Sequence, residues 1–382
     1  MPFATMRAPY ARRRGDGKPA SRAAARAIAA AFGRTGDAAR SRPGIMLAPR
    51  GRSDRLGPTL SDGAKTMDRR HLLGAAAGLL AAPAALRAQS LPKITIGMSG
   101  WTGFAPLTLA EQAGLFRANG IEVETKFVPQ RERNLALVSG ALNCVVTTVD
   151  TMILWASAAP LTQVLVLDRS RGGDGIGVRP AINSWGDLKG KTVAVDGAGT
   201  TPYFVLAYMM RENGMSIRDV TTATLAPQPA AQAFVAGQFD ACSTYEPYLS
   251  QVRAMGADKG KILATTLDYP CVVDTLGFQP SFIQANPEAV RRVVKSWFDA
   301  IAMIAREPDR SFEIMGRRVN QTGEQFKASA QFIEWLDQAK NKDYVANGLP
   351  QFMQKAHLVQ RETGVVRQDV NLGPLLNTSF LG

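Results

Sequence analysis

Short apolar runs alternate with amphipathic segments from residue 94 to residue 255. The run ITIGM (94–98) has the length of a buried strand, and the helix after it begins at Pro106, where proline suits the first helical turn. The same unit then repeats. We predict further strands at 121–127, 141–147, 161–168, 192–196, 220–225 and 241–245, and further helices at 131–140, 149–158, 200–213, 229–236 and 247–255. This alternation predicts an α/β fold.

A glycine-rich crossing, RGGDGIGV (171–178), divides the pattern into two series of strands and helices. We therefore predict two Rossmann-like lobes, because about 294 residues are enough to bury two adjoining cores. Lobe 1 would hold residues 91–173 and 277–382, and lobe 2 residues 174–276. Two chain crossings, near 171–177 and 271–277, would form a two-segment hinge.

Beyond Gly277 the pattern becomes helical, and we predict helices at 287–305, 309–319, 323–339 and about 344–363. In the first of these helices the apolar side chains recur at helical spacing, at Val290, Val293, Val294, Trp297, Ile301 and Ile304. Such a stripe is more typical of core packing than of a groove for a partner. We expect these helices to cover the sheet of lobe 1.

The first 88 residues differ from the rest of the chain. Residues 67–88 contain a twin arginine (Arg69 and Arg70), an apolar stretch and a small residue at Ala88, the layout of a secretory signal of the twin-arginine type cleaved near Ala88. Residues 1–66 are rich in Arg and Ala and lack apolar periodicity, so we expect a disordered extension. Because a signal peptide normally stands at the N-terminus, we expect translation to begin at Met67, so that residues 1–66 would not be part of the protein. The alternative is that residues 1–66 form a nucleic-acid-binding arm.

Net charge also separates the first 88 residues from the rest of the chain. The formal charge of +13 is concentrated before residue 89, where the extension contributes +10 and the signal +2. The body, residues 89–382, carries only +1, and so offers few basic side chains to neutralise phosphates. We therefore predict no nucleic-acid partner, and no apolar run is long enough for a mature membrane helix.

Several kinds of catalysis are disfavoured by composition. The chain has two histidines, His71 and His357, and its three cysteines, Cys144, Cys242 and Cys271, form no C-x-x-C pair. No zinc motif and no G-x-S-x-G motif is present, so we predict neither catalytic residues nor a metal site. We expect at least one cysteine to be buried and free, and a disulfide stays open as an alternative.

A candidate ligand site begins at the helix after residue 196. The segment DGAGTTP (196–202) follows a strand, but Pro202 stands where a dinucleotide-binding motif has its third glycine, so no cofactor is predicted. Small residues at a helix N-terminus instead aim N–H groups at an anion. The candidate residues here are Gly199, Thr200, Thr201 and Tyr203.

Two further groups of candidates follow strands in lobe 1 and lobe 2. Ligands in open α/β sheets bind at the carboxyl ends of strands. By this argument we select the aromatic and small residues Trp101, Thr102, Gly103, Phe104, Thr147, Thr148 and Tyr245. Core burial of the two aromatic residues and helix capping by the threonines are the alternatives.

Two acidic residues are expected to face the same cleft. Asp174 lies in the glycine-rich crossing, and Glu246 follows the strand ACSTY directly. Two carboxylates favour a ligand with a cationic or amine end, and together with the anion site they suit a zwitterion. Structural roles in turns or caps, and a catalytic carboxylate pair, are the alternatives.

Several stretches together resemble a known family. They are ITIGMSGWTGFAPLTLAEQAGLFRANGIEVE, NSWGDLKGKTVAVDGAGTTPYFVL, AAQAFVAGQFDACSTYEPYLS and GPLLNTSFL. They are similar to the periplasmic substrate-binding proteins of ABC importers for nitrate, taurine and aliphatic sulfonates, a family that includes pyrimidine-precursor binders. The resemblance covers about residues 91–382. It implies a two-lobed, type II-like periplasmic binding fold that closes on a small molecule and delivers it to a permease and its ATPase, and we expect a monomer.

Carried over to this chain, the family's cleft falls on the candidate residues already selected. The acidic pair makes nitrate and bicarbonate less attractive, and no arginine occurs in these loops to clamp a sulfonate. A taurine-like zwitterion or an amine-bearing heterocycle fits better. The alternative is an enzyme resembling the fungal pyrimidine synthases, whose histidine and cysteine-rich motif this chain lacks. A transcription regulator would need a DNA-binding module that the sequence does not suggest.

Overall fold

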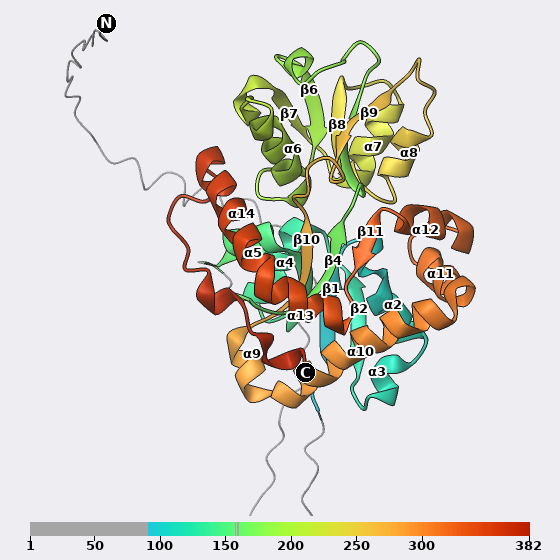
Figure 1. Ribbon diagram of the computed structural model, residues 1–382, viewed down its shortest axis with the longest axis vertical. Helices are drawn as coiled ribbons and strands as arrows, with labels where there is room; N and C mark the ends of the chain where they lie inside the picture. Colours follow the sequence, from blue (N-terminus) through green and yellow to red (C-terminus); the bar gives the residue numbers. More distant parts are fainter. Residues whose placement is uncertain (1–90, 157, 159) are drawn as a thin grey trace, which may run out of the picture. The chain divides into compact units, whose positions relative to one another are not determined.

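The computed structural model describes residues 91–156, 158 and 160–382, which contain two β-sheets (Figure 1). The larger sheet has the order β11-β4-β10-β3-β1-β2 and the smaller one β7-β6-β8-β5-β9. The larger sheet consists of β1 (Ile94–Met98), β2 (Val123–Phe127), β3 (Cys144–Thr148), β4 (Thr162–Ser170), β10 (Val273–Phe278) and β11 (Ile333–Trp335). The smaller sheet consists of β5 (Asp174–Val178), β6 (Thr192–Val195), β7 (Thr221–Thr224), β8 (Ala241–Tyr245) and β9 (Lys261–Thr265). The extension and the signal expected at 1–88 lie outside the described residues.

Both sheets have the same internal plan. A parallel trio comes from consecutive βα units, with β1 between β2 and β3 in one sheet and β6 between β7 and β8 in the other. Antiparallel strands extend each trio. The strands β10, β4 and β11 extend the larger sheet, and β5 and β9 extend the smaller one. The α/β fold class that the sequence predicts is confirmed.

The helices cover the sheets in the positions that their apolar faces require. The lobe that holds the larger sheet contains α2 (Ala105–Gln112), α3 (Leu115–Ala118), α4 (Gln130–Val138), α5 (Val149–Trp155), α9 (Pro280–Ala285), α10 (Pro287–Arg306), α11 (Pro308–Arg317), α12 (Gly323–Ala330), α13 (Gln338–Asn347) and α14 (Leu349–Thr363). Of these, α2, α4, α5 and α13 contact the strands, and α14 packs on α5. The smaller sheet carries α6 (Thr201–Glu212), α7 (Pro227–Val235) and α8 (Leu249–Arg253). Short 3₁₀ turns occur at η1 (Thr102–Phe104), η2 (Gly186–Leu188), η3 (Ile217–Asp219), η4 (Gly373–Leu375) and η5 (Thr378–Phe380).

The apolar side chains that the sequence predicts on one face of α10 are mostly buried in the core. Val290, Val293, Val294 and Trp297 are buried, while Ile301 and Ile304 are only partly covered. The helix packs on α2 of lobe 1, as expected. Cys144, Cys242 and Cys271 are all buried and free. No helix in the described part of the chain is long and apolar enough to span a membrane.

Three features of the fold differ from the prediction. The crossing predicted at 171–178 contains the strand β5, and β9 and β10 were not predicted. The predicted helix 323–339 is wrong, because α12 ends at Ala330 and β11 pairs with β4. The apolar spacing of Phe326, Ala330, Ile333 and Leu336 also fits a helix, and only the sheet edge offered by β4 decides for a strand.

The boundary between the lobes also moves. The strand β10 belongs to the larger sheet, so the second crossing occupies residues 266–272 and lobe 2 ends before Val273 rather than at residue 276. The first crossing occupies residues 171–173, between β4 and β5. Ser170 and Thr266 join the two crossings through their hydroxyl groups, whose oxygens are 2.7 Å apart. The chain therefore crosses between the lobes through two short, adjacent segments (Figure 1).

Candidate functional site

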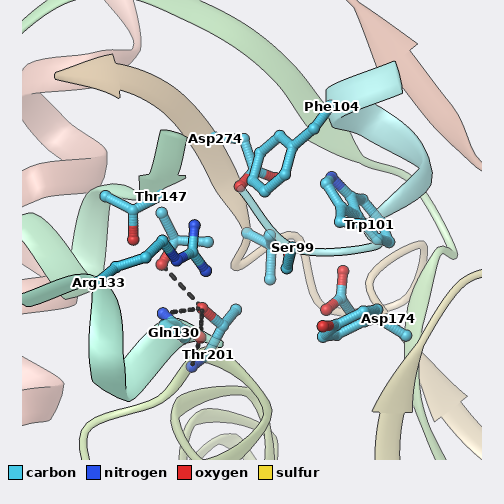
Figure 2. A pocket seen from close by; sticks show the side chains of 12 residues that line it. Ser99, Trp101, Phe104, Gln130, Arg133, Thr147, Asp174, Thr201 and Asp274 are labelled. Carbon is cyan, nitrogen blue, oxygen red and sulfur yellow. Dashed lines mark hydrogen bonds between the residues drawn. The ribbon is translucent and has the colours of Figure 1, made fainter. Parts of the chain in front are cut away.

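A pocket of about 290 Å³ lies between the two sheets, next to the crossings (Figure 2). Both lobes contribute to its wall, mainly through the ends of strands and the starts of helices. The residues that line it are Ser99, Trp101, Phe104, Gln130, Arg133, Thr147, Thr148, Asp174, Thr201, Tyr245, Val272 and Asp274. We call this space the inner pocket.

One wall of the inner pocket is a network of hydroxyl and amide groups. Gln130 donates through Nε2 to Thr151 Oγ1 at 2.6 Å and to Thr201 Oγ1 at 3.0 Å. The hydroxyl oxygens of Thr148 and Thr201 are 2.9 Å apart. Because Thr201 begins α6 in lobe 2 and its partners, Gln130 and Thr148, belong to α4 and β3 in lobe 1, the network links the two lobes (Figure 2).

Arg133 is the one basic side chain among the residues that the structure places around the inner pocket. It is 2% exposed, Nη1 donates to the carbonyl oxygen of Val146, and Nε has no hydrogen-bond partner. Burial lowers the pKa of Arg133 to about 10. The guanidinium is therefore still charged at neutral pH and can attract an anionic or acceptor group.

Two carboxyl groups also line the inner pocket, and one of them, Asp274, is paired with Thr148 in the larger sheet. Asp174 and Asp274 are each 2% exposed, and Oδ2 of each lacks a hydrogen-bond partner. Burial raises the pKa of Asp174 to about 8, and burial together with the neighbouring Asp168 raises the pKa of Asp274 well above its ordinary value. An unpaired oxygen in a dry wall is costly unless a ligand supplies a donor. These carboxyl groups therefore favour an amine or another N–H donor.

Trp101 forms the aromatic side of the inner pocket. Its Nε1 donates to Asp168 Oδ1 at 3.1 Å, and its ring meets that of Tyr245 edge to face, with 5.7 Å between centroids. Gly103 and Gly173 leave room for the indole. A Cβ at Gly173 would lie 2.6 Å from Trp101 Cη2, and one at Gly103 would collide with Nε1. The ring is held in one orientation before any ligand arrives.

The structure brings together seven of the residues selected from sequence: Trp101, Phe104, Thr147, Thr148, Asp174, Thr201 and Tyr245. Thr102 and Gly103 lie in η1 outside the lining, and Gly103 accepts a hydrogen bond from Trp335 Nε1 at 2.9 Å.

Three further residues that were selected from the sequence line a separate cavity of about 240 Å³. Gly199, Thr200 and Tyr203 line it together with Asp150 and Gln360, away from the inner pocket. The start of α6 is thus divided between two cavities, and only Thr201 faces the inner pocket.

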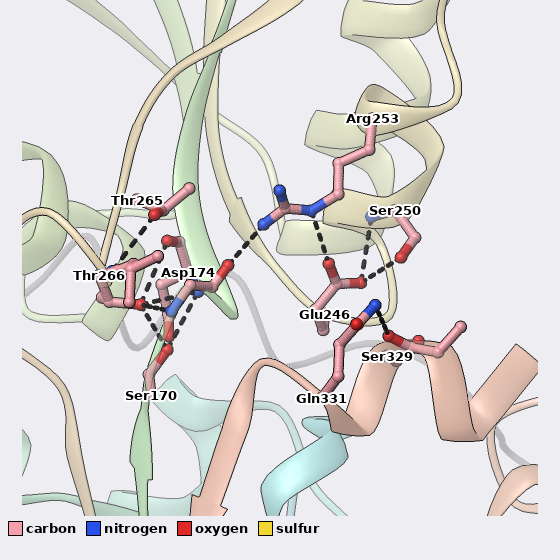
Figure 3. A network of polar contacts seen from close by, with 12 residues as sticks. Ser170, Asp174, Glu246, Ser250, Arg253, Thr265, Thr266, Ser329 and Gln331 are labelled. Atoms are coloured by element: carbon pink, nitrogen blue, oxygen red, sulfur yellow. Dashed lines mark hydrogen bonds and ion pairs between the residues drawn. The ribbon is translucent and has the colours of Figure 1, made fainter.

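Glu246 does not face the inner pocket, contrary to the expectation from sequence. Its Oε2 accepts hydrogen bonds from Ser250 N and Oγ, and its Oε1 accepts one from Arg253 Nε at 3.2 Å (Figure 3). Arg253 also donates to the carbonyl oxygen of Gly172. Glu246 lies just beyond the end of β8, where its carboxylate is held by the start of α8 and by Arg253 and not by the pocket. Glu246 instead holds α8 against the first crossing.

The pattern of the NMT1-like family matches residues 87–315. The chain belongs to the NMT1-like family. The riboflavin-binding protein RibY of Chloroflexus aurantiacus is 27% identical over 252 residues, which are 63% of this chain and 70% of RibY. Among solved structures, the alkanesulfonate-binding protein SsuA from Xanthomonas axonopodis pv. citri, bound to MOPS, superimposes with a TM-score of 0.63 at 19% identity, covering 76% of this chain and 99% of SsuA.

The periplasmic nitrate-binding protein NrtA from Synechocystis PCC 6803 has the same architecture. Its TM-score is 0.54 at 15% identity, and the match covers 75% of this chain and 92% of NrtA. These likenesses show the type II periplasmic binding fold, so the predicted fold and family resemblance are confirmed.

Sequence reasoning missed five residues of this NMT1-like protein's inner pocket: Ser99, Gln130, Arg133, Val272 and Asp274. For two of these residues the sequence contains a feature that could have revealed them. Arg133 is four residues before Leu137, which is fully buried, so both lie on the inner face of α4. Asp274 is a charge inside the apolar strand VDTLGF. Among the described residues no group of His, Cys, Asp and Glu could hold a metal ion.

Proposed function

We propose that this protein is the exported, periplasmic solute-binding protein of an ABC importer. It acts as a monomer that closes its lobes on a small polar ligand, then delivers the ligand to the permease and its ATPase. The family, the fold and the position of the inner pocket between the lobes support this function. The crossings 171–173 and 266–272 would absorb the backbone change of hinge closure.

The unpaired carboxyl oxygens of Asp174 and Asp274, which line the same pocket as Arg133, carry the proposal for the ligand. A cationic or N–H-rich end would contact these carboxyl groups, and an acceptor end would face the Arg133 guanidinium and the Gln130 amide. A taurine-like zwitterion or an amine-bearing heterocycle has both ends. A ring in the ligand would contact Trp101. Nitrate has no cationic end and would leave the carboxyl groups unpaired.

The ligands named for the relatives define the first compounds to test. Riboflavin is a flat heterocycle with an imide N–H and O–H donors but no amine, so it meets only the ring and donor parts of the proposal, whereas an alkanesulfonate without an amine meets neither. A protein of this function returns its ligand chemically unchanged, which separates it from the pyrimidine-synthase alternative.

The test is a thermal-shift screen of the full chain with taurine, alkanesulfonates, nitrate, guanidinium, aminopyrimidines and riboflavin. A ligand that binds only the folded state raises the melting temperature. Calorimetry on a hit then compares Asp174→Asn and Asp274→Asn with Asp258→Asn, whose carboxyl group is exposed. We expect each pocket variant to lose about 1–3 kcal/mol of binding free energy, the scale of a charge-assisted hydrogen bond, and the control to lose none.

Two results would contradict the proposal. Tight binding of nitrate with both pocket variants unaffected would show that the carboxyl groups do not select the ligand. Mass spectrometry that finds the bound compound converted to a product would show an enzyme.

A further inference from the structure

A wider groove of about 980 Å³ adjoins the inner pocket. Ser99 and Tyr245 line both spaces, so the two adjoin at these side chains. Like the inner pocket, the groove has walls from both lobes. The ends of β1, β2 and α11 belong to lobe 1, and the start of α7 and the end of β8 belong to lobe 2. We call this space the outer groove.

The outer groove presents flat apolar surface from both lobes. Phe127 is 46% exposed, although it is a large apolar side chain at the end of a strand. On the side of lobe 2, Tyr245 and Tyr248 form a tilted pair with 5.7 Å between ring centroids. The absence of a side chain at Gly100 leaves room for Tyr248, because a Cβ at Gly100 would lie 2.8 Å from the tyrosine hydroxyl oxygen. Exposed aromatic surface that faces a cavity is typical of a ligand site.

A single arginine adds polarity to this surface. Arg318 Cζ lies 4.5 Å from the centroid of the Phe127 ring, and Nη2 donates to the carbonyl oxygen of Thr125 at 3.0 Å. Its Nε is buried and has no hydrogen-bond partner. Glu111 approaches no closer than 4.0 Å, so the guanidinium is weakly paired. An acceptor or anionic group in the outer groove would find a partner here.

The inner pocket and the outer groove therefore differ in both size and chemistry. The inner pocket, with about 290 Å³ of empty space, is much smaller than the outer groove, with about 980 Å³. The inner pocket is acidic on one wall, whereas the outer groove is aromatic and carries a cation. A solute filling only the inner pocket would leave Phe127 and Tyr248 uncovered.

We propose that the outer groove holds the second half of the solute: the ligand is elongated, with an amine head at Asp174 and Asp274 and a flat ring between Phe127 and Tyr248, ending in an acceptor group at Arg318. This inference rests on the proposed function, because it requires the head to occupy the inner pocket. Lobe closure would cover both parts at once, since each space has walls from both lobes.

Three amines of increasing length test the proposal on the full chain. Butylamine supplies the head alone, 4-phenylbutylamine adds the ring, and 4-(4-aminobutyl)benzoate adds a carboxylate. Calorimetry is expected to give at least tenfold tighter binding of 4-phenylbutylamine than of butylamine, and a further gain for the benzoate.

Two variants assign these gains to the outer groove. Phe127→Ser is expected to remove the advantage of the ring and to leave butylamine affinity unchanged. Arg318→Gln is expected to remove only the advantage of the carboxylate. Leu358→Ser is the matched control, because Leu358 is a comparably exposed apolar side chain, at 49%, on the distant helix α14. All three affinities should stay the same in this control.

The outcomes separate this inference from the proposed function. If butylamine binds, loses affinity in Asp274→Asn, and gains nothing from the ring, the outer groove is not a subsite and the proposed function stands. A ring advantage that persists in Phe127→Ser also overturns the inference. If no amine binds at all, the amine head is wrong, and the inference falls with it.

Discussion

The lobes meet in two places whose charges are arranged in opposite ways. In the inner pocket, Asp174 and Asp274 are buried and each has an unpaired oxygen. Where α6 of lobe 2 meets α14 of lobe 1, the charged groups are solvent-accessible and paired. There Arg211 forms an ion pair with Glu362, and Lys355 forms one with Glu212.

The comparison suggests different roles for the two regions: the inner pocket binds the ligand, and the α6–α14 contact attaches one lobe to the other. Buried, unpaired carboxyl groups lower the stability of the empty protein but give a matching ligand strong contacts. Exposed pairs add little stability and break easily, which suits a contact that would form and separate in the lobe closure proposed above. The two lobe contacts thus place strong selectivity in one region and weak, reversible attachment in the other.

The largest expected effect is on stability, and it would test whether the inner pocket is destabilising when empty. The pKa of Asp174 is raised from 3.8 to about 8, so between these values the unfolded chain loses its proton while the folded protein retains it. Stability is full below about pH 4 and falls as pH rises to about 8, by up to about 1.4 kcal/mol per pH unit.

Urea unfolding of Asp174→Asn at pH 4.5, 6 and 8 checks this expectation. The variant should match the wild type at the lowest pH and become the more stable of the two as pH rises. A constant difference at every pH would show that the carboxyl group does not titrate in this range.

Proton release on binding is the next effect, and it sharpens the comparison. Butylamine carries its charge throughout this pH range, so its binding is expected to ionise Asp174. Below about pH 8 its affinity should rise up to about tenfold per pH unit, the slope for one released proton. Calorimetry in buffers of different ionisation enthalpy measures the proton directly. Asp174→Asn should flatten the profile, and an unflattened profile would point to another group.

The smallest effect is expected at the contact between α6 and α14. Glu362→Gln removes one of the two ion-pair partners of Arg211, the other being Glu212, and the side chains of Arg211 and Glu362 are exposed, so stability should change by no more than about 0.5 kcal/mol. Ligand affinity should weaken by less than about threefold, and high salt should remove even that difference because exposed pairs are screened. Calorimetry at low and high salt tests this. A large loss that persists in salt would place selectivity here as well.

The sequence predicted the site unevenly. Residues near the carboxyl ends of strands, such as Trp101 after β1 and Tyr245 at the end of β8, were found because ligands in open α/β sheets bind at those ends. Arg133 was missed because it reaches the pocket from within a helix, and Glu246 was misplaced because the direction of one side chain depends on how the following helix packs. A pattern of residue types does not contain these orientations.

By itself, the sequence determined the βα units, the apolar face of α10 and membership of the NMT1-like family, because these depend on local periodicity and on motifs of neighbouring residues. Tertiary structure alone decided that Ile333–Trp335 is a strand, that β10 returns to the larger sheet, and that Asp274 lies opposite Asp168. These pairings join segments about a hundred or more residues apart. Such contacts form only when a sheet edge is already present, so no local pattern specifies them.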